Sequence, residues 1–122
     1  MEKILIVDDQ QGIRLLLEEI FKREGLATYL AASGIEALEI SRNVKLDAIL
    51  LDLKLPSMDG KEVLKRIKIT SPNVPVVIMS ASGEIDLIQE TMELGASHYM
   101  IKPFDIFELR DVIRGVLHTQ LT

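Results

Sequence analysis

Four aliphatic segments of this sequence end on polar side chains that could take part in chemistry. The side chains that close them are Asp8 with Asp9, Asp52, Ser80 and Lys102. A charge at the end of a buried segment costs free energy unless a partner or a reaction uses it. Asp52 is the candidate nucleophile, because a carboxylate can attack phosphorus and form an acyl phosphate. Lys102 would supply a fixed positive charge to the transferred group, and Ser80 a hydroxyl.

Each of these residues, taken singly, also has an ordinary structural interpretation. Asp52 could form a turn, Ser80 could simply end a strand, and Lys102 could be a solvated lysine before a turn. Four segments that all end on such groups are a stronger indication than any one of them. The coincidence therefore favours a single catalytic site built from several strand ends.

The three aspartates predict a metal site. Asp8, Asp9 and Asp52 would repel one another in one crevice unless a cation joined them. Carboxylates are hard oxygen ligands, so the expected ion is Mg²⁺, for which Mn²⁺ could substitute. The structural alternative is that the pair begins a helix, with Gln11 completing an arrangement like a capping box with Asp8.

Strand-like and helix-like segments alternate along the whole chain. The expected strands are residues 3–7, 27–32, 47–52, 74–79 and 98–101, and the expected helices are residues 10–24, 34–42, 61–70, 84–94 and 105–117. In the second helix, Ile35, Ala37 and Leu38 are expected to face inward. The pattern predicts an α/β fold of three layers, a flavodoxin-like doubly wound parallel sheet with strand order 2-1-3-4-5. Ligands bind such sheets at the carboxyl ends of the strands, where the strand order reverses, and all three aspartates would lie there.

Composition limits the class of protein. A chain of 122 residues is expected to form one domain over residues 1–122, with no output domain. The net charge of −5, without a run of Lys or Arg, argues against nucleic acids and anionic membranes as partners. The absence of cysteine excludes disulfides and thiolate metal sites. No apolar segment approaches the ~20 residues that span a bilayer, and Asp8 interrupts the first one too early for a signal peptide. We therefore expect a cytoplasmic protein.

Several motifs, in order and at their spacings, resemble the receiver domains of bacterial two-component response regulators. They are residues 4–9 (ILIVDD), 50–52 (LLD), 55–60 (LPSMDG), 79–81 (MSA), 95–96 (GA) and 102–104 (KPF). The resemblance covers essentially the whole chain. It implies that Asp52 is the phosphoacceptor and that Lys102 binds the phosphoryl group, with the bond from Lys102 to Pro103 in cis.

The same resemblance implies the metal ligands and the switch residues. Mg²⁺ would be held by Asp8, Asp9, Asp52 and the backbone carbonyl of Lys54. Ser80 is the implied switch hydroxyl. Tyr99 corresponds to the aromatic switch residue of many receivers, although it could also be a half-buried aromatic on an edge strand.

A closer likeness is to the single-domain receivers of the sporulation phosphorelay in bacilli. These carry phosphoryl groups from a sensor histidine kinase to a histidine phosphotransferase. They have a histidine where this chain has Tyr99 and an aromatic residue where it has Ser82. Two other functions would use the same residues: a receiver that acts by phosphorylation-dependent binding, as in chemotaxis, and a Mg²⁺-dependent phosphatase. The phosphatase is disfavoured, because such enzymes need a second aspartate where this chain has Lys54.

The first helix carries more aliphatic residues than one buried face requires. Leu15 and Leu16 fall outside that face or at its margin, although scattered exposed leucines are also normal. This helix borders the crevice that holds Asp52, and a partner histidine must approach Asp52 over that border. We expect the protein to be a monomer. The predicted docking surface is Gln10, Gly12, Ile13, Leu15, Leu16, Pro103 and Phe104.

Overall fold

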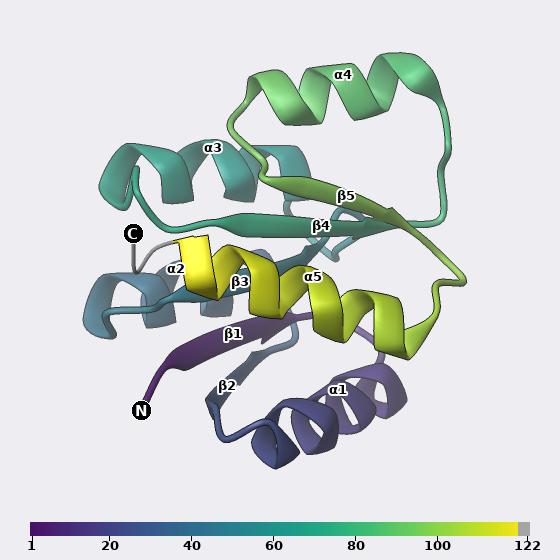
Figure 1. Ribbon diagram of the computed structural model, residues 1–122. Helices are drawn as coiled ribbons and strands as arrows, with labels where there is room; N and C mark the ends of the chain where they lie inside the picture. Colours follow the sequence, from purple (N-terminus) through teal and green to yellow (C-terminus); the bar gives the residue numbers. More distant parts are fainter. Residues whose placement is uncertain (120–122) are drawn as a thin grey trace.

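A computed structural model describes residues 1–119 of the chain. Five parallel strands form one sheet in the order β2-β1-β3-β4-β5, as the sequence predicted (Figure 1). The strands are β1 (Lys3–Val7), β2 (Ala27–Ala31), β3 (Ala48–Asp52), β4 (Val76–Ser80) and β5 (His98–Ile101). The helices are α1 (Gln11–Arg23), α2 (Gly34–Asn43), α3 (Gly60–Thr70), α4 (Ile85–Glu93) and α5 (Ile106–Thr119).

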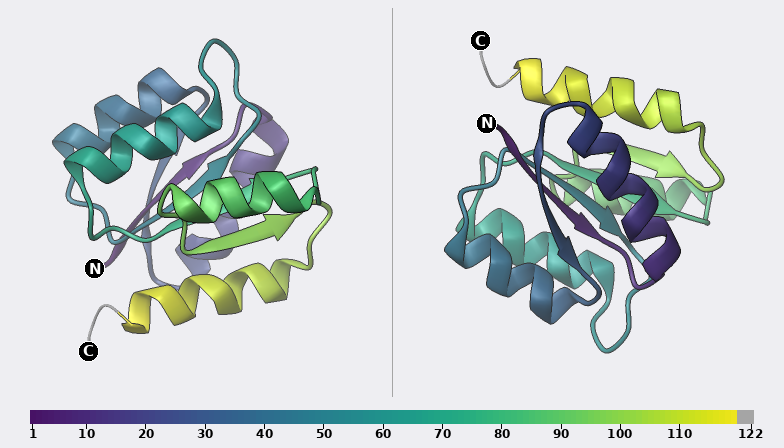
Figure 2. Two further views of the ribbon diagram at one scale, coloured as in Figure 1. Left: turned by 90° about the horizontal axis from the view of Figure 1, so that it is seen from above. Right: turned by 90° about the horizontal axis from the view of Figure 1, so that it is seen from below.

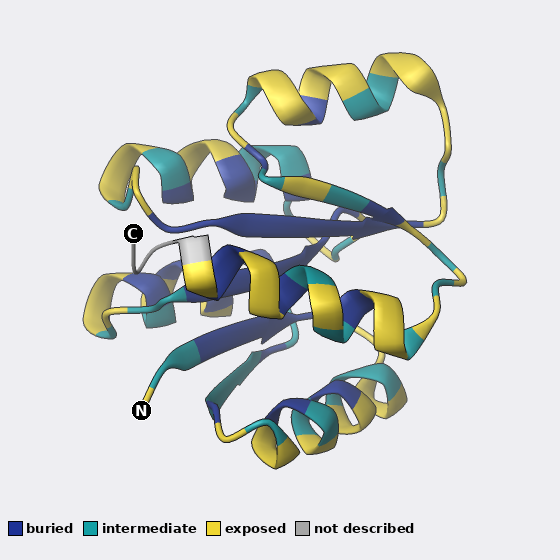
Figure 3. Ribbon diagram, viewed as in Figure 1, coloured by how far each residue is buried: buried dark blue, intermediate teal, exposed yellow. Residues whose placement is uncertain are grey.

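The sheet is covered on both faces, so the molecule has three layers. Helices α1 and α5 lie on one face, and α2, α3 and α4 lie on the other (Figures 1 and 2). Side chains alternate along a strand, and in β3 Ile49 and Leu51 pack toward α2 and α3, whereas Leu50 packs toward α1 and α5. Figure 3 shows the central strands as the most buried part of the fold. Two hydrophobic cores, one on each face, therefore hold the strands in place.

Most expected element boundaries agree with the structure within one or two residues. The expected start of the fourth strand at Val74 was two residues early. There the amide of Val74 donates to the carbonyl of Ser71 in a turn (3.2 Å), and Pro75 has no N–H to donate. Of residues 1–119, no helix combines the length and the apolar character needed to cross a membrane.

The expectation that Ile35 faces inward was wrong. Its side chain is 62% exposed, whereas Gly34, Ala37, Leu38 and Ser41 form the buried face of α2. At 100° per residue, Ile35 lies about 110° from the centre of that face, so it points toward solvent.

Candidate functional site

The carboxyl ends of four neighbouring strands meet at one edge of the sheet, on the right of Figure 1. The register pairs Val7 with Leu51, Asp52 with Met79, and Ser80 with Ile101. The residues that end or follow these strands therefore lie close together. This arrangement confirms the expected fold, in which these four strands end side by side and strand order reverses between β1 and β3.

A lysine bridges two buried carboxylates at the centre of this edge. Lys102 Nζ lies 3.0 Å from Asp8 Oδ2 and 3.0 Å from Asp52 Oδ2. The lysine thus joins two aspartates that are 44 positions apart in the chain. Asp8 is fully buried and Asp52 is 5% exposed. Ionised groups are rarely buried without partners, so the ion pairs account for the burial of both aspartates.

The backbone holds the other oxygen of each buried carboxylate. Asp52 Oδ1 accepts a hydrogen bond from the amide of Lys54 (3.0 Å), and Asp8 Oδ1 accepts one from the amide of Gln10 (2.9 Å). The structural alternative, a capping box formed by Asp8 and Gln11, is not found. The N-cap position of α1 is Gln10, and its side chain makes no capping hydrogen bond. Both carboxylates are thus fixed in orientation by local turns.

The electrostatics of the site follow from burial and from these contacts. Burial raises the pKa of Asp52, against the opposing effects of the Lys54 amide and of Lys102. Burial lowers the pKa of Lys102, but its hydrogen bonds to Asp52 and Asp8 outweigh burial, and the pKa is raised overall. Lys102 therefore stays positively charged at neutral pH. Because burial disfavours the ionised form of Asp52, a further cation nearby would stabilise that form.

Three aspartates form a cluster with the chemistry of a divalent-cation site. One carboxylate oxygen from each of Asp8, Asp9 and Asp52 lies within 4.8 Å of the others. Asp9 is exposed, so the cluster opens toward solvent on its side. An all-oxygen donor set with an open side suits Mg²⁺, which prefers oxygen ligands and usually keeps several waters. The residues present therefore fit this ion.

Ser80 and Tyr99 are linked through the backbone of Ser82. The amide of Ser82 donates to Ser80 Oγ (3.1 Å), and the hydroxyl of half-buried Tyr99 donates to the carbonyl of Ser82 (2.7 Å). The amide of Lys102 also donates to the carbonyl of Ser80 (2.7 Å). The sequence indicated Ser80 and Tyr99 as switch residues and Ser82 as a departure from the sporulation receivers, but not that Ser82 connects the other two.

The residues of the expected docking surface differ in exposure. Exposed members are Gln10, Gly12, Leu15, Leu16 and Pro103, and half-buried members are Ile13 and Phe104. The bond between Lys102 and Pro103 is cis, as the resemblance implied. Leu15 and Leu16 are 50% and 47% exposed, which agrees with their expected position outside the buried face of α1.

Two further residues contact the site and were not assigned a role from the sequence. Arg14 Nη1 donates to the backbone carbonyl of Asp8 (2.7 Å). Gly60 lies so close to the loop after β3 that an added Cβ would be 2.4 Å from the Cα of Leu53. The contact of Arg14 could have been expected, because Arg14 lies one turn into the helix that follows Asp8. The contact of Gly60 could not, because a close backbone approach leaves no sequence signal beyond the glycine itself.

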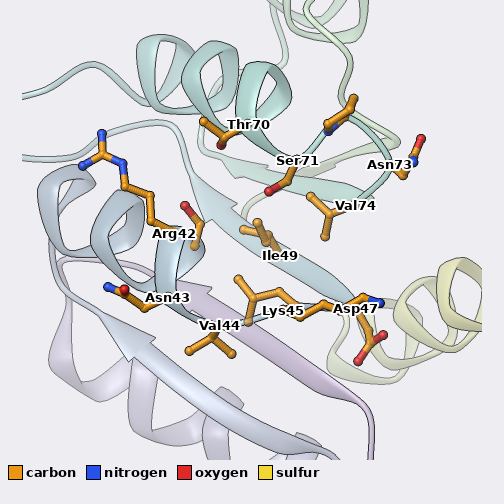
Figure 4. Close-up of a pocket in the computed structure, with 13 residues that line it drawn as sticks. Arg42, Asn43, Val44, Lys45, Asp47, Ile49, Thr70, Ser71, Asn73 and Val74 are labelled. Carbon is orange, nitrogen blue, oxygen red and sulfur yellow. The ribbon is translucent and has the colours of Figure 1, made fainter.

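A cavity lies at the opposite end of the sheet, where β3 and β4 begin (Figure 4). It has a volume of about 590 Å³ and is lined by residues 41–47, 49 and 70–74. Figure 4 shows Ile49 near its centre, with Thr70 and Ser71 at its border. Asp47 is the one acidic residue in the lining, and its carboxylate accepts a hydrogen bond from the amide of Lys3 (2.7 Å). The charged residues of this lining are exposed, as Arg42 and Lys45 are, or half-buried, as Asp47 is. The buried carboxylates lie at the other end of the sheet, so we place the chemistry there.

Comparison with known proteins points to one family. Residues 4–114 match the family model described as the response regulator receiver domain. The chain is 54% identical over 116 residues to sporulation initiation phosphotransferase F of Bacillus subtilis, covering 95% of this chain and 94% of that protein. It is 35% identical to regulatory protein AtoC of Escherichia coli, covering 98% of this chain but only 26% of that longer protein.

Solved structures show the same fold. A CheY-like receiver from Methanospirillum hungatei superposes with a TM-score of 0.95 at 28% identity, covering 98% of this chain and 96% of that chain. Chemotaxis protein CheY4 of Vibrio cholerae superposes with a TM-score of 0.90 at 29% identity, covering 96% and 99%. The chain belongs to the response regulator receiver domain family.

Proposed function

We propose that this protein accepts a phosphoryl group from a sensor histidine kinase onto Asp52 and passes it to a histidine phosphotransferase. The observation that carries the proposal is the placement of Lys102 between the buried carboxylates of Asp8 and Asp52, at 3.0 Å from each. A buried nucleophilic carboxylate beside a fixed cation is what transfer of an anionic phosphoryl group requires.

In the forward step, a carboxylate oxygen of Asp52 attacks the phosphorus of a phosphohistidine. A P–O bond to Asp52 forms as the P–N bond breaks, and the departing imidazole nitrogen keeps the electron pair and takes a proton from solvent. Lys102 binds a phosphoryl oxygen, and the Lys54 amide holds the acceptor carboxylate in orientation. The second transfer reverses these bond changes with the histidine of the phosphotransferase.

Mg²⁺ would be held by Asp8, Asp9, Asp52 and the backbone carbonyl of Lys54. When bound, this ion neutralises charge on the phosphoryl oxygens. Asp8 and Asp9 serve this function by presenting oxygens next to the acceptor. Mn²⁺ could substitute, because it accepts the same oxygen ligands.

Phosphorylation would also act as a switch. A phosphoryl group adds close to two negative charges at neutral pH, by analogy with phosphoserine. The Ser80 hydroxyl would turn toward it and exchange its contact with the Ser82 amide for one with a phosphoryl oxygen. Because Ser82 also binds Tyr99, this exchange would alter the position of the aromatic ring.

The relay is favoured over a binding switch by the likeness to the Bacillus subtilis phosphotransferase, which extends over nearly the whole of both chains. In the relay, the partner approaches over exposed Leu15 and Leu16 on α1 and over Pro103. The protein would act as a monomer, because one partner histidine at a time must reach Asp52. The binding-switch alternative uses the same phosphorylation but needs no second transfer.

The test is labelling by a radioactive phosphodonor, with Mg²⁺ or with a chelator, of the wild type and of Asp52→Asn. We expect labelling only in the wild type with Mg²⁺. Asp86→Asn, which removes an exposed acid of α4, is the control and should label normally. Labelling that persists in Asp52→Asn would overturn the assignment.

The labelled protein is then mixed with a histidine phosphotransferase. Transfer of the label to the phosphotransferase supports the relay. Loss of the label only as inorganic phosphate, together with a gain in affinity for another protein, would instead establish the binding switch.

A further inference from the structure

We propose that Arg14 is a positioning residue that holds the β1–α1 loop so that Asp8 and Asp9 can bind the divalent cation. This inference rests on the metal site of the proposed function. Its central observation is the 2.7 Å hydrogen bond from Arg14 Nη1 to the backbone carbonyl of Asp8. Because the donor is a guanidinium, the bond is charge-assisted and stronger than one between neutral groups.

Arg14 joins the helix to the loop at two points. Its backbone amide donates to the carbonyl of Gln10 (3.1 Å), which begins the hydrogen bonding of α1, while its side chain reaches back to Asp8. On the strand side, the amide of Asp8 donates to the carbonyl of Ala31 (3.1 Å). Asp8 is therefore fixed at its N–H by β2 and at its carbonyl by Arg14.

Little else from α1 holds this loop. The N-cap residue, Gln10, makes no side-chain capping hydrogen bond, although capping side chains usually order the start of a helix. Asp9 is exposed and lies between Asp8 and Gln10. The direction of the Asp9 carboxylate thus depends on how firmly its two neighbours are held, and the side chain of Arg14 supplies one of those constraints.

Positioning and simple electrostatics predict opposite results when Arg14 is replaced. A positive charge near the aspartates repels a divalent cation, so its removal alone would tighten Mg²⁺ binding. Loss of the contact that orients the ligands would weaken Mg²⁺ binding instead. Residues that orient metal ligands typically change affinity 10–100-fold when mutated, and we expect about tenfold, because Arg14 acts on the backbone of one ligand.

The experiment titrates Mg²⁺ into ¹⁵N-labelled protein and follows the amide shifts of Asp9, Gln10 and Lys54. We expect the dissociation constant to rise about tenfold in Arg14→Ala and to be partly restored in Arg14→Lys, which keeps one charged donor. Hydrogen exchange at the Gln10 amide should also become faster in Arg14→Ala. The control is Arg23→Ala, which removes the same charge from the same helix, where Arg23 pairs with Glu19 on the surface (2.7 Å).

A purely structural role would lower the melting temperature without changing the dissociation constant of the folded protein. Unchanged or tighter Mg²⁺ binding in Arg14→Ala would overturn the inference, and so would equal weakening in Arg23→Ala. If the wild type itself shows no saturable shifts with Mg²⁺, the metal site of the proposed function fails as well. Saturation in the wild type together with unchanged binding in Arg14→Ala removes only the role of Arg14.

Discussion

The two ends of the sheet differ in what they bury. At the carboxyl end, three ionised side chains, Asp8, Asp52 and Lys102, lie together with little or no exposure of the carboxylates. At the amino end, a cavity of about 590 Å³ is built around Ile49 and bordered by polar side chains, and the charged residues Arg42 and Lys45 in its lining are exposed. The end with the chemistry is therefore marked by buried charge and not by the volume of its hollow.

This difference has an energetic basis. Burying a charge costs several kcal/mol even after the protein relaxes around it, so a fold keeps such a cluster only where partners or function compensate. A cavity whose charged side chains stay in contact with solvent carries no such cost and can arise wherever helices end, as α2 and α3 do near Asn43 and Thr70. Buried charge is thus the better guide to the site in this molecule.

The largest expected effect comes from removing the cation at the carboxyl end. Lys102→Met should reduce the rate of phosphorylation about 10²–10³-fold, the usual cost of losing one group that stabilises developing charge. The same substitution should tighten Mg²⁺ binding, because Lys102 no longer competes for Asp8 Oδ2 and Asp52 Oδ2. Labelling kinetics and a Mg²⁺ titration, both well below the melting temperature, measure the two effects.

The matched control at the amino end is Lys45→Met. Lys45 is exposed and lines the cavity there, and its replacement removes the same charge. We expect phosphorylation and Mg²⁺ affinity to stay within twofold of wild type. Comparable losses in both variants would mean that net charge, and not the position of Lys102, sets the rate.

A smaller effect is expected from a methyl group added beside the loop after β3. In Gly60→Ala, the new Cβ would be 2.4 Å from the Cα of Leu53, and backbone atoms cannot rotate away as a side chain can. We expect a loss of about 1–3 kcal/mol in the free energy of unfolding and slower phosphorylation, because Leu53 precedes Lys54, whose amide binds Asp52. Chemical denaturation and labelling test both.

Gly115→Ala is the control for this substitution. Gly115 lies near the end of α5, toward the amino end of the sheet (Figure 1). Its added Cβ would meet no atom within 4 Å apart from its chain neighbours and the backbone of its own helix. An alanine in a helix is better than glycine by up to ~1 kcal/mol, so this variant should be as stable as wild type or more so. If Gly60→Ala were equally harmless, the loop after β3 would be more adaptable than its packing indicates.

The local pattern was sufficient for the strands and for their polar ends, Asp8, Asp52, Ser80 and Lys102. The strand order needed in addition the general rules for doubly wound parallel sheets. The sequence was insufficient where a tertiary contact decides. The rotation of α2 about its axis leaves Ile35 exposed. This rotation depends on which side chains of α2 pack against the rest of the protein, and the sequence alone does not decide it. The link from Ser80 to Tyr99 through Ser82 depends on backbone directions.

The smallest effect is expected from the loss of a single hydroxyl, that of Tyr99 on β5. Tyr99→Phe removes the hydrogen bond to the carbonyl of Ser82 and should lower the free energy of unfolding by about 1 kcal/mol. Tyr29→Phe is the control, because Tyr29 packs against the core from β2 and its hydroxyl reaches no strand-end loop in the contacts found among residues 1–119. If Ser82 connects the phosphorylation site to the ring, phosphorylation should shift the amide resonance of Ser82 less in Tyr99→Phe than in wild type. An identical shift in both proteins would show that Ser80 acts on Ser82 without involving Tyr99, and the aromatic residue would then be a packing residue of an edge strand.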